Sequence, residues 1–85
     1  MPTPILVPKV ARNTNLYKVA HWNKKINELV HQEEILLEFE VNKATVPLLS
    51  RTTGYLIKKC RVAGEYIKYK ETIAILAHPA EFKKG

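Results

Sequence analysis

The sequence predicts an all-β domain, a flattened β-barrel or sandwich made of two four-stranded halves that a pseudo-twofold axis relates. Three observations predict this class. Short strand-like segments recur along the chain, with turn-prone residues between them. No window holds an apolar stripe at i, i+3, i+4 and i+7 of useful length. The second half of the chain also resembles the first half, which indicates a duplicated unit.

Six segments are expected to form strands, because apolar and β-branched residues recur in them and turn residues bound them. Pro47 cannot donate to a β-ladder, so its segment is expected at a sheet edge or to be irregular. Residues 23–34 are expected to form at most a turn or two of helix, since a polar stretch follows Val30. The expected strands are Ile5–Val7, Leu16–Trp22, Ile35–Val41, Thr45–Leu49, Gly54–Val62 and Thr72–Leu76.

The internal repeat has an offset of 37 residues. Asn27 corresponds to Gly64, and these residue types are the best able to adopt a positive φ, so each half is expected to contain a tight turn there. Neither half can bury its own apolar face, so the halves are expected to pack together. The matched pairs are Asn27 with Gly64, Glu28 with Glu65, Val30 with Ile67, Glu34 with Glu71, and Leu36 with Ile73.

Length and composition indicate one small globular domain. The chain has 85 residues, of which 46% are hydrophobic. We expect the domain to span residues 1–78, with residues 79–85 as a tail or the start of a linker. No apolar run approaches the ~20 residues of a membrane span. The proline-rich start does not resemble a signal peptide, so a cytoplasmic or mitochondrial-matrix location is expected.

The residue types present exclude several kinds of site. The chain has no Asp, which excludes Asp-containing catalytic triads and EF-hand loops. Its histidines are far apart in sequence and Cys60 is the only cysteine, so no metal site is expected. Cys60 shares strand parity with Leu56 and Val62 and is expected to be a small buried side chain. Trp22 is expected to pack in or beside the core.

The net charge of +6 predicts an acidic surface on at least one partner. One alternative is a nucleic-acid-binding barrel of the OB type, because cations and tyrosines mix in the second half of the chain as they do in single-strand binders. Glutamates interrupt this set and no RNP-like motif is present, so nucleic acid is the less favoured partner. The set comprises Tyr55, Lys58, Lys59, Arg61, Tyr66, Lys68, Tyr69 and Lys70.

A lone lysine stands at a candidate hairpin tip. Residues 38–46 read EFEVNKATV, in which strand-like stretches flank the pair Asn42-Lys43. Lys43 falls between the two halves of the repeat, and small Ala44 leaves its surroundings open. A primary amine on a long stem, presented by a rigid domain, is suited to modification by another protein.

The chain also resembles the lipoyl domains of 2-oxo acid dehydrogenase complexes, in the biotinyl/lipoyl carrier family, over residues 5–77. The Asp-Lys-Ala turn of that family reads Asn42-Lys43-Ala44 here. The resemblance implies the fold of the family, a barrel-sandwich hybrid. The early Trp, the first turn pair, the run into the lysine, the strand-opening Gly and the second turn pair are matched by Trp22, Asn27-Glu28, Leu36-Leu37-Glu38-Phe39-Glu40, Gly54 and Gly64-Glu65.

The resemblance implies a non-catalytic carrier whose cofactor is lipoic acid, joined by an amide to Lys43 and acting as a swinging arm. Its implied partners are a lipoate ligase or lipoyl transferase and the 2-oxo acid dehydrogenase, acyltransferase and dihydrolipoamide dehydrogenase components of such a complex. The modifying ligase must find one of eleven lysines. Glu38 and Glu40, just before the turn, are the candidate recognition residues.

Several departures from the family pattern keep alternatives open. The residue before the lysine is Asn42 rather than Asp, the first turn glycine is Asn27, and the surface is basic where many lipoyl domains are acidic. A free-standing or degenerate carrier with unusual partners is therefore one alternative. A biotinyl carrier is another, although that family flanks its lysine with methionines and the only Met here is residue 1.

Overall fold

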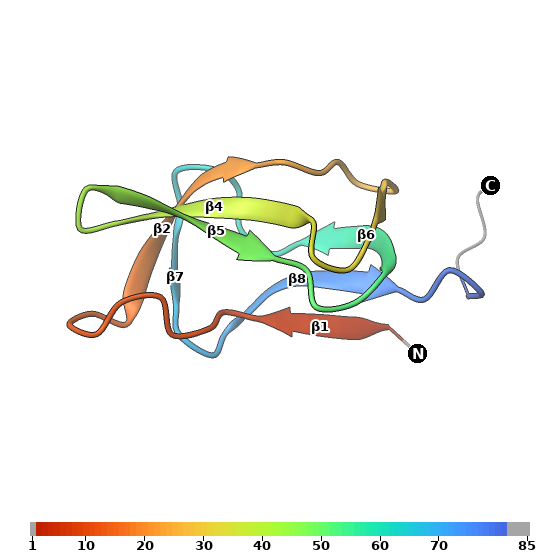
Figure 1. The fold of residues 1–85 in the computed structure, drawn as a ribbon, viewed down its shortest axis with the longest axis horizontal. Coiled ribbons are helices and arrows are strands. Elements are labelled where there is room, and N and C mark those ends of the chain that lie inside the picture. The colour runs from red at the N-terminus through yellow and green to blue at the C-terminus, as the bar shows by residue number, and fades with distance from the viewer. Residues whose placement is uncertain (1, 82–85) are drawn as a thin grey trace.

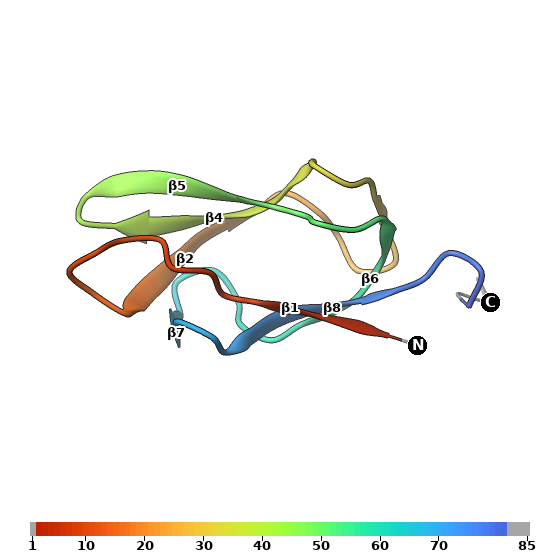
Figure 2. The same ribbon diagram turned by 60° about the horizontal axis from the view of Figure 1, so that its bottom comes forward.

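The chain folds into two antiparallel sheets that pack face to face. The computed structural model describes residues 2–81, in which the sheets have the strand orders β1-β8-β6-β3 and β5-β4-β2-β7. Figure 1 shows β1, β4 and β8 running close to the long axis, and Figure 2 shows the two layers. The strands are β1 (Thr3–Leu6), β2 (Leu16–Trp22), β3 (Leu29–Val30), β4 (Ile35–Val41), β5 (Ala44–Leu49), β6 (Gly54–Lys59), β7 (Tyr66–Lys68) and β8 (Thr72–Ala77).

The predicted all-β class and the two four-stranded halves are confirmed. The described residues form a sandwich of two separate sheets rather than a closed barrel. All six predicted strands are present, with ends that differ by a few residues. The predicted strand Gly54–Val62 ends at Lys59, because the chain turns between Val62 and Glu65. The helical turns expected within residues 23–34 are absent, and this segment contains turns and β3 instead.

A pseudo-twofold axis relates the two sheets, as the repeat predicts. Exchanging β1 with β5, β8 with β4, β6 with β2 and β3 with β7 converts one strand order into the other. The registers also correspond: Val19 lies opposite Phe39, and the residues 37 positions later, Leu56 and Leu76, lie opposite each other. A bulge interrupts both pairings at the same place, just after Val19 and just after Leu56.

Two equivalent tight turns close the halves. Asn27 and Gly64 have φ values of 72° and 97°, so both turns need the left-handed backbone region that the sequence predicts. The Gly64 N–H donates to Val19 O at 2.7 Å, and the Asn27 N–H donates to Leu56 O at 2.6 Å. In each turn a glutamate carboxylate accepts a backbone N–H three residues earlier, at 2.8 Å for both Glu28 and Glu65.

The core lies between the sheets and holds one side chain or more from almost every strand. Tyr17 and Phe39 are fully buried and their ring centroids are 5.9 Å apart. The Tyr17 hydroxyl accepts the Val10 N–H at 3.1 Å, so the buried phenol keeps a polar partner. Burial of each large apolar side chain contributes roughly 1.5–3 kcal/mol. The buried apolar residues include Val7, Val19, Val30, Leu36, Leu37, Leu48, Leu56, Ile67, Ile73 and Leu76.

Two predictions about packing have different outcomes. Trp22 is half-buried against the core, as predicted, and its Nε1–H donates to Arg61 O at 2.9 Å. Cys60 is only half-buried, so its prediction as a core side chain is wrong. The bulge after Leu56 reverses the side-chain alternation, and β6 ends before Cys60, so parity with Leu56 no longer points its side chain inward. Val62, the other residue in that argument, is 61% exposed.

Both free sheet edges on one side of the sandwich carry a proline. β1 and β5 are edge strands, and Pro4 and Pro47 occupy equivalent positions, opposite Ile75 and Glu38 respectively. The edge placement predicted for Pro47 is therefore confirmed. A proline has no N–H to offer, which limits further strand addition at these edges.

Any side chain in place of Gly54, at the start of β6, is predicted to lower the stability of the fold. A Cβ at this position would lie 2.7 Å from Ala77 O and 3.1 Å from Leu76 Cβ. Gly54→Ala should therefore lower the free energy of unfolding in urea by about 2 kcal/mol. Gly64→Ala is the comparison, because an added Cβ meets nothing within 4 Å there and only the φ of 97° opposes it, with a cost of about 1 kcal/mol. A smaller loss for Gly54→Ala than for Gly64→Ala would contradict the close-packing explanation.

Glu34 is predicted to make stability pH-dependent. Its carboxylate accepts the His31 N–H at 2.7 Å and lies 3.2 Å from Lys24 Nζ. The hydrogen bond from His31 has the larger effect and the Lys24 contact adds to it, and together they hold the pKa of Glu34 below its ordinary value. A carboxyl that is more acidic in the folded chain stabilises the fold above its unfolded pKa, and this contribution is lost as pH falls through the folded pKa.

Glu34→Gln should consequently lower the urea midpoint at neutral pH and make no difference in acid below the folded pKa. Urea titrations across this pH range measure the effect. Glu33→Gln is the control, since the neighbouring carboxyl is exposed and should change the midpoint little at any pH. A difference between Glu34→Gln and wild type that persists unchanged into acid would contradict the assignment.

Candidate functional site

The Asn42-Lys43 pair forms the two-residue loop of a β-hairpin. Val41, at the end of β4, pairs with Ala44, at the start of β5. Asn42 has a φ of 51° and Lys43 a φ of 64°, so both central residues adopt the left-handed conformation of a type I′ turn. Asn is favoured in that conformation, whereas Lys is strained by roughly 1 kcal/mol. The predicted hairpin tip is therefore confirmed, and it holds a non-glycine residue in a disfavoured backbone region.

The segment between β1 and β2 supports the hairpin from one side. Asn42 Nδ2 donates to Asn13 Oδ1 at 3.1 Å. Figures 1 and 2 both show this segment beside the hairpin, at the same end of the molecule. The hydrogen bond fixes the Asn42 side chain and leaves the adjacent Lys43 exposed.

The hairpin and the described ends of the chain lie at opposite poles of an elongated molecule. The principal extents are 41 × 19 × 18 Å. The loop between β4 and β5 projects at one end of the long axis, while β1 begins and β8 ends towards the other (Figure 1). Lys43 is therefore presented at the pole opposite the described ends of the chain.

A hollow of about 280 Å³ adjoins Lys43 on the outer face of the β5-β4-β2-β7 sheet. Glu40 lines it, whereas Glu38 lies farther along β4, half-buried and opposite His21 and Pro47. The structure thus brings only one of the two candidate recognition residues to the lysine. The lining residues are Thr14, Leu16, Lys18, Glu40, Val41, Asn42, Lys43 and Tyr66.

The sequence did not indicate that Leu16, Lys18 and Tyr66 lie beside the lysine. Lys18 is the cross-strand partner of both Glu40 and Tyr66, and Leu16 precedes it on β2. Alternation along β2 was available as a signal, since Leu16 and Lys18 point to the same face. The register that joins this face to β4 and β7 is not readable from the sequence.

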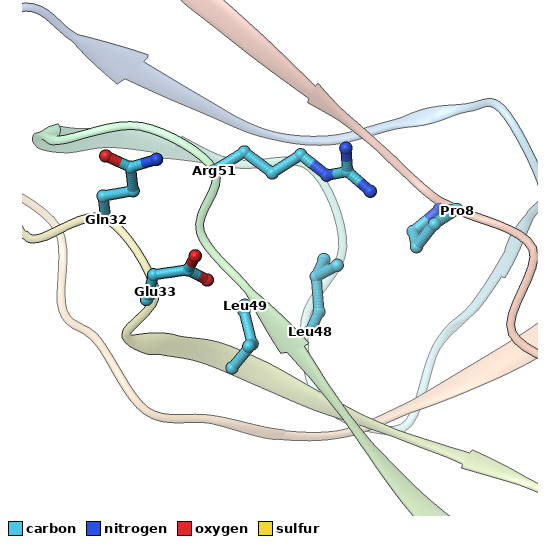
Figure 3. A pocket seen from close by; sticks show the side chains of 6 residues that line it. All are labelled: Pro8, Gln32, Glu33, Leu48, Leu49 and Arg51. Carbon is cyan, nitrogen blue, oxygen red and sulfur yellow. The ribbon is translucent and has the colours of Figure 1, made fainter.

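A larger hollow lies between the edge strands and is separate from the lysine. It has a volume of about 580 Å³ and is lined by Pro8, Gln32, Glu33, Leu48, Leu49 and Arg51. Figure 3 shows the Arg51 side chain extended towards Pro8. No nucleophile or general base other than Glu33 lines it. Nowhere in residues 2–81 do three or more His, Cys or Glu side chains gather as a metal site would require.

The basic and aromatic residues that suggested nucleic-acid binding do not share one face. Tyr55 and Lys58 lie on β6 of one sheet, whereas Tyr66 and Lys68 lie on β7 of the other. Arg61 is paired with Glu71 at 3.6 Å. A single-strand binder needs a continuous groove with aromatic side chains on which bases stack. These residues are divided between two sheets, so they do not form such a groove. Among the described residues no helix is long and apolar enough to cross a membrane.

Comparisons of the sequence and of the fold with known proteins agree with this architecture. The profile of the biotin/lipoyl family, described as "Biotin-requiring enzyme", matches residues 3–76. The chain belongs to this family. The solution structure of the lipoyl domain of the 2-oxoglutarate dehydrogenase complex from Azotobacter vinelandii has the same fold, with a TM-score of 0.71 and 23% sequence identity. The similarity covers 88% of this chain and 95% of that one.

Curated relatives of this biotin/lipoyl domain are much longer proteins. One relative is the dihydrolipoyllysine-residue succinyltransferase component of the 2-oxoglutarate dehydrogenase complex from Haemophilus influenzae. The two sequences are 26% identical over 81 residues, and the match covers 95% of this chain and 20% of the relative. The Rickettsia bellii protein of the same name is 30% identical over 73 residues, covering 86% of this chain and 18% of the relative. The chain therefore spans about a fifth of these relatives.

The backbone at Asn42 is predicted to control the hairpin of this family member. Asn42→Val should lower the free energy of unfolding by about 1–2 kcal/mol, because a β-branched residue resists a positive φ. Asn42→Gly is the matched control. Both variants lose the hydrogen bond to Asn13, so the difference between their urea midpoints isolates the backbone effect. Equal midpoints would show that the turn is not held in the left-handed conformation.

Proposed function

We propose that this domain is a lipoyl carrier, in which Lys43 bears lipoic acid through an amide on its ε-nitrogen. The observation that carries the proposal is the position of Lys43. It is the exposed second residue of the two-residue turn that joins β4 to β5. Four other lysines, Lys18, Lys58, Lys59 and Lys68, lie on strands, and the Lys70 N–H donates to Val7 O in the body of the domain.

The residues around Lys43 fit such a group. Within residues 2–81 no carboxylate pairs with its ammonium, so the amine is available to an acylating enzyme. Ala44 is exposed and small, and it leaves the long stem free to turn. Acylation removes the positive charge, so the neighbouring Glu40 cannot hold the arm against the domain.

Lipoic acid is favoured over biotin for two reasons. The chain has Asn42 and Ala44 beside the lysine and no methionine after residue 1, whereas biotinyl domains flank their lysine with methionines. The similar curated proteins are named as dihydrolipoyllysine-residue succinyltransferase components. The Asp-to-Asn change at residue 42 is compatible with a carrier role for the domain, because both residue types adopt a positive φ readily.

When attached, the lipoyl dithiolane supplies acyl transfer and two-electron chemistry. The domain itself contributes position rather than catalysis. The hairpin holds the Lys43 Cα at one pole, and the buried core keeps that pole rigid. Tethering then raises the effective concentration of the carried group at each enzyme that the domain can reach.

The partners follow from this role. We propose that a lipoate ligase or lipoyl transferase modifies Lys43 and that the loaded domain serves the dehydrogenase, acyltransferase and dihydrolipoamide dehydrogenase components of a 2-oxo acid dehydrogenase complex, in the cytoplasm or the mitochondrial matrix. The basic surface favours partners with acidic docking surfaces.

Intact mass spectrometry tests the proposal. The protein, incubated with a lipoate ligase, ATP and lipoic acid, should gain a single lipoyl adduct. Lys43→Arg should gain none, since arginine keeps the charge but cannot form the amide. A parallel reaction with a biotin ligase and biotin should leave the mass unchanged.

The outcomes separate the alternatives. An adduct on Lys43→Arg would place the modified amine elsewhere, and a biotin adduct on wild type would make the domain a biotinyl carrier. No adduct on a sample shown by urea titration to be folded would favour a degenerate carrier.

A further inference from the structure

The pseudo-twofold repeat provides an internal comparison for every surface position. Each half contributes equivalent strands and turns, two strands to each sheet, so a residue type that the fold requires should recur 37 positions away. The turn glutamates recur, as Glu28 and Glu65, and so does the turn cation, as Lys24 and Arg61. The fold therefore does not require the residue type at a surface position where the repeat has a different one.

Two large apolar side chains lie exposed beside Lys43, and one of them, Leu16, has no apolar counterpart in the repeat. Leu16 is 48% exposed and Tyr66 is 56% exposed, and both line the hollow next to the lysine. Their counterparts in the other half are Thr53 and Leu29, which are both half-buried. The fold thus accepts a threonine where Leu16 stands, and the exposed leucine contributes little burial to the domain.

The charges of the same hollow do not recur either. Lys18 on β2 lies directly opposite Glu40 on β4. The equivalent pair on the other sheet is Tyr55 opposite Ala77. The hollow beside Lys43 therefore combines two exposed apolar groups with one cation and one anion, and the equivalent place at the other pole has no charged pair.

We infer that the face formed by Leu16, Lys18, Glu40 and Tyr66 is the docking surface for the enzyme that acylates Lys43. The inference rests on the proposed function. That enzyme must enclose the Lys43 amine, so it must cover the surface around the turn. The segment containing Asn13 borders the hairpin, and its Thr14 lines the hollow. The hollow is the concave part of the surface around the turn, and Lys43 itself lines it.

The chemistry of the hollow specifies the partner's contact. An apolar side chain of the ligase fills the space between Leu16 and Tyr66, while a ligase anion and cation meet Lys18 and Glu40. Such a contact combines apolar and charged groups, as protein interfaces commonly do. It also gives the ligase a contact beside Lys43 that the other described hollows do not offer, because their linings contain none of these four residues.

The test measures the initial rate of adduct formation with a lipoate ligase, followed by intact mass. Leu16→Thr combined with Tyr66→Ser should slow the reaction about tenfold. Leu6→Thr is the matched control and should react within about twofold of wild type, because Leu6 is 53% exposed but lies on edge strand β1. Urea titration confirms that each variant is folded before its rate is measured.

A charge exchange separates recognition from stability. In Lys18→Glu with Glu40→Lys the cross-strand pair is kept but its direction is reversed, so the fold should hold while the reaction becomes slower than that of wild type. A wild-type rate for this double variant would overturn the part of the charged pair in docking.

The remaining outcomes distinguish the two levels of inference. Wild-type rates for folded Leu16→Thr/Tyr66→Ser, with Lys43 as the modified residue, would overturn the docking surface and leave the carrier role in place. No modification of folded wild type would overturn the proposed function, and the docking surface with it.

Discussion

The burial of two equivalent sheet faces against each other is the constraint on which the rest of this molecule depends. Each sheet presents an apolar face that it cannot cover, and about a dozen side chains are removed from water only when the two sheets meet. The pseudo-twofold arrangement follows, because it places like faces together. It also fixes the turns, since Asn27 and Gly64 must reverse the chain within reach of the opposite sheet.

The same symmetry explains the polarity of the molecule. The hairpin around Lys43 corresponds, 37 residues on, to the segment around Ala80, where the chain leaves the sandwich. One pole is therefore closed by a two-residue turn, and the other carries the ends of the described chain (Figure 1). A domain of this design can be joined to other protein at one pole and present a side chain at the other.

The proposed carrier needs little chemistry of its own. Its fold presents the Lys43 amine at an exposed turn, where no carboxylate of residues 2–81 pairs with it. The surface of the two sheets then differs where the core does not. Glu38 and Glu40 on β4 correspond to Ile75 and Ala77 on β8, and Ala77 is buried. The two sheets therefore differ in charge at equivalent positions.

The sequence by itself determined the all-β class, the repeat, both positive-φ turns and the hairpin of Lys43, since alternation and turn residues are local signals. It misplaced Cys60, because the bulge after Leu56 is set by pairing with β8. It also missed Leu16, Lys18 and Tyr66 beside the lysine. Only the tertiary structure decided these, because cross-strand register joins residues that are distant in the chain and no local pattern records which strand lies beside which.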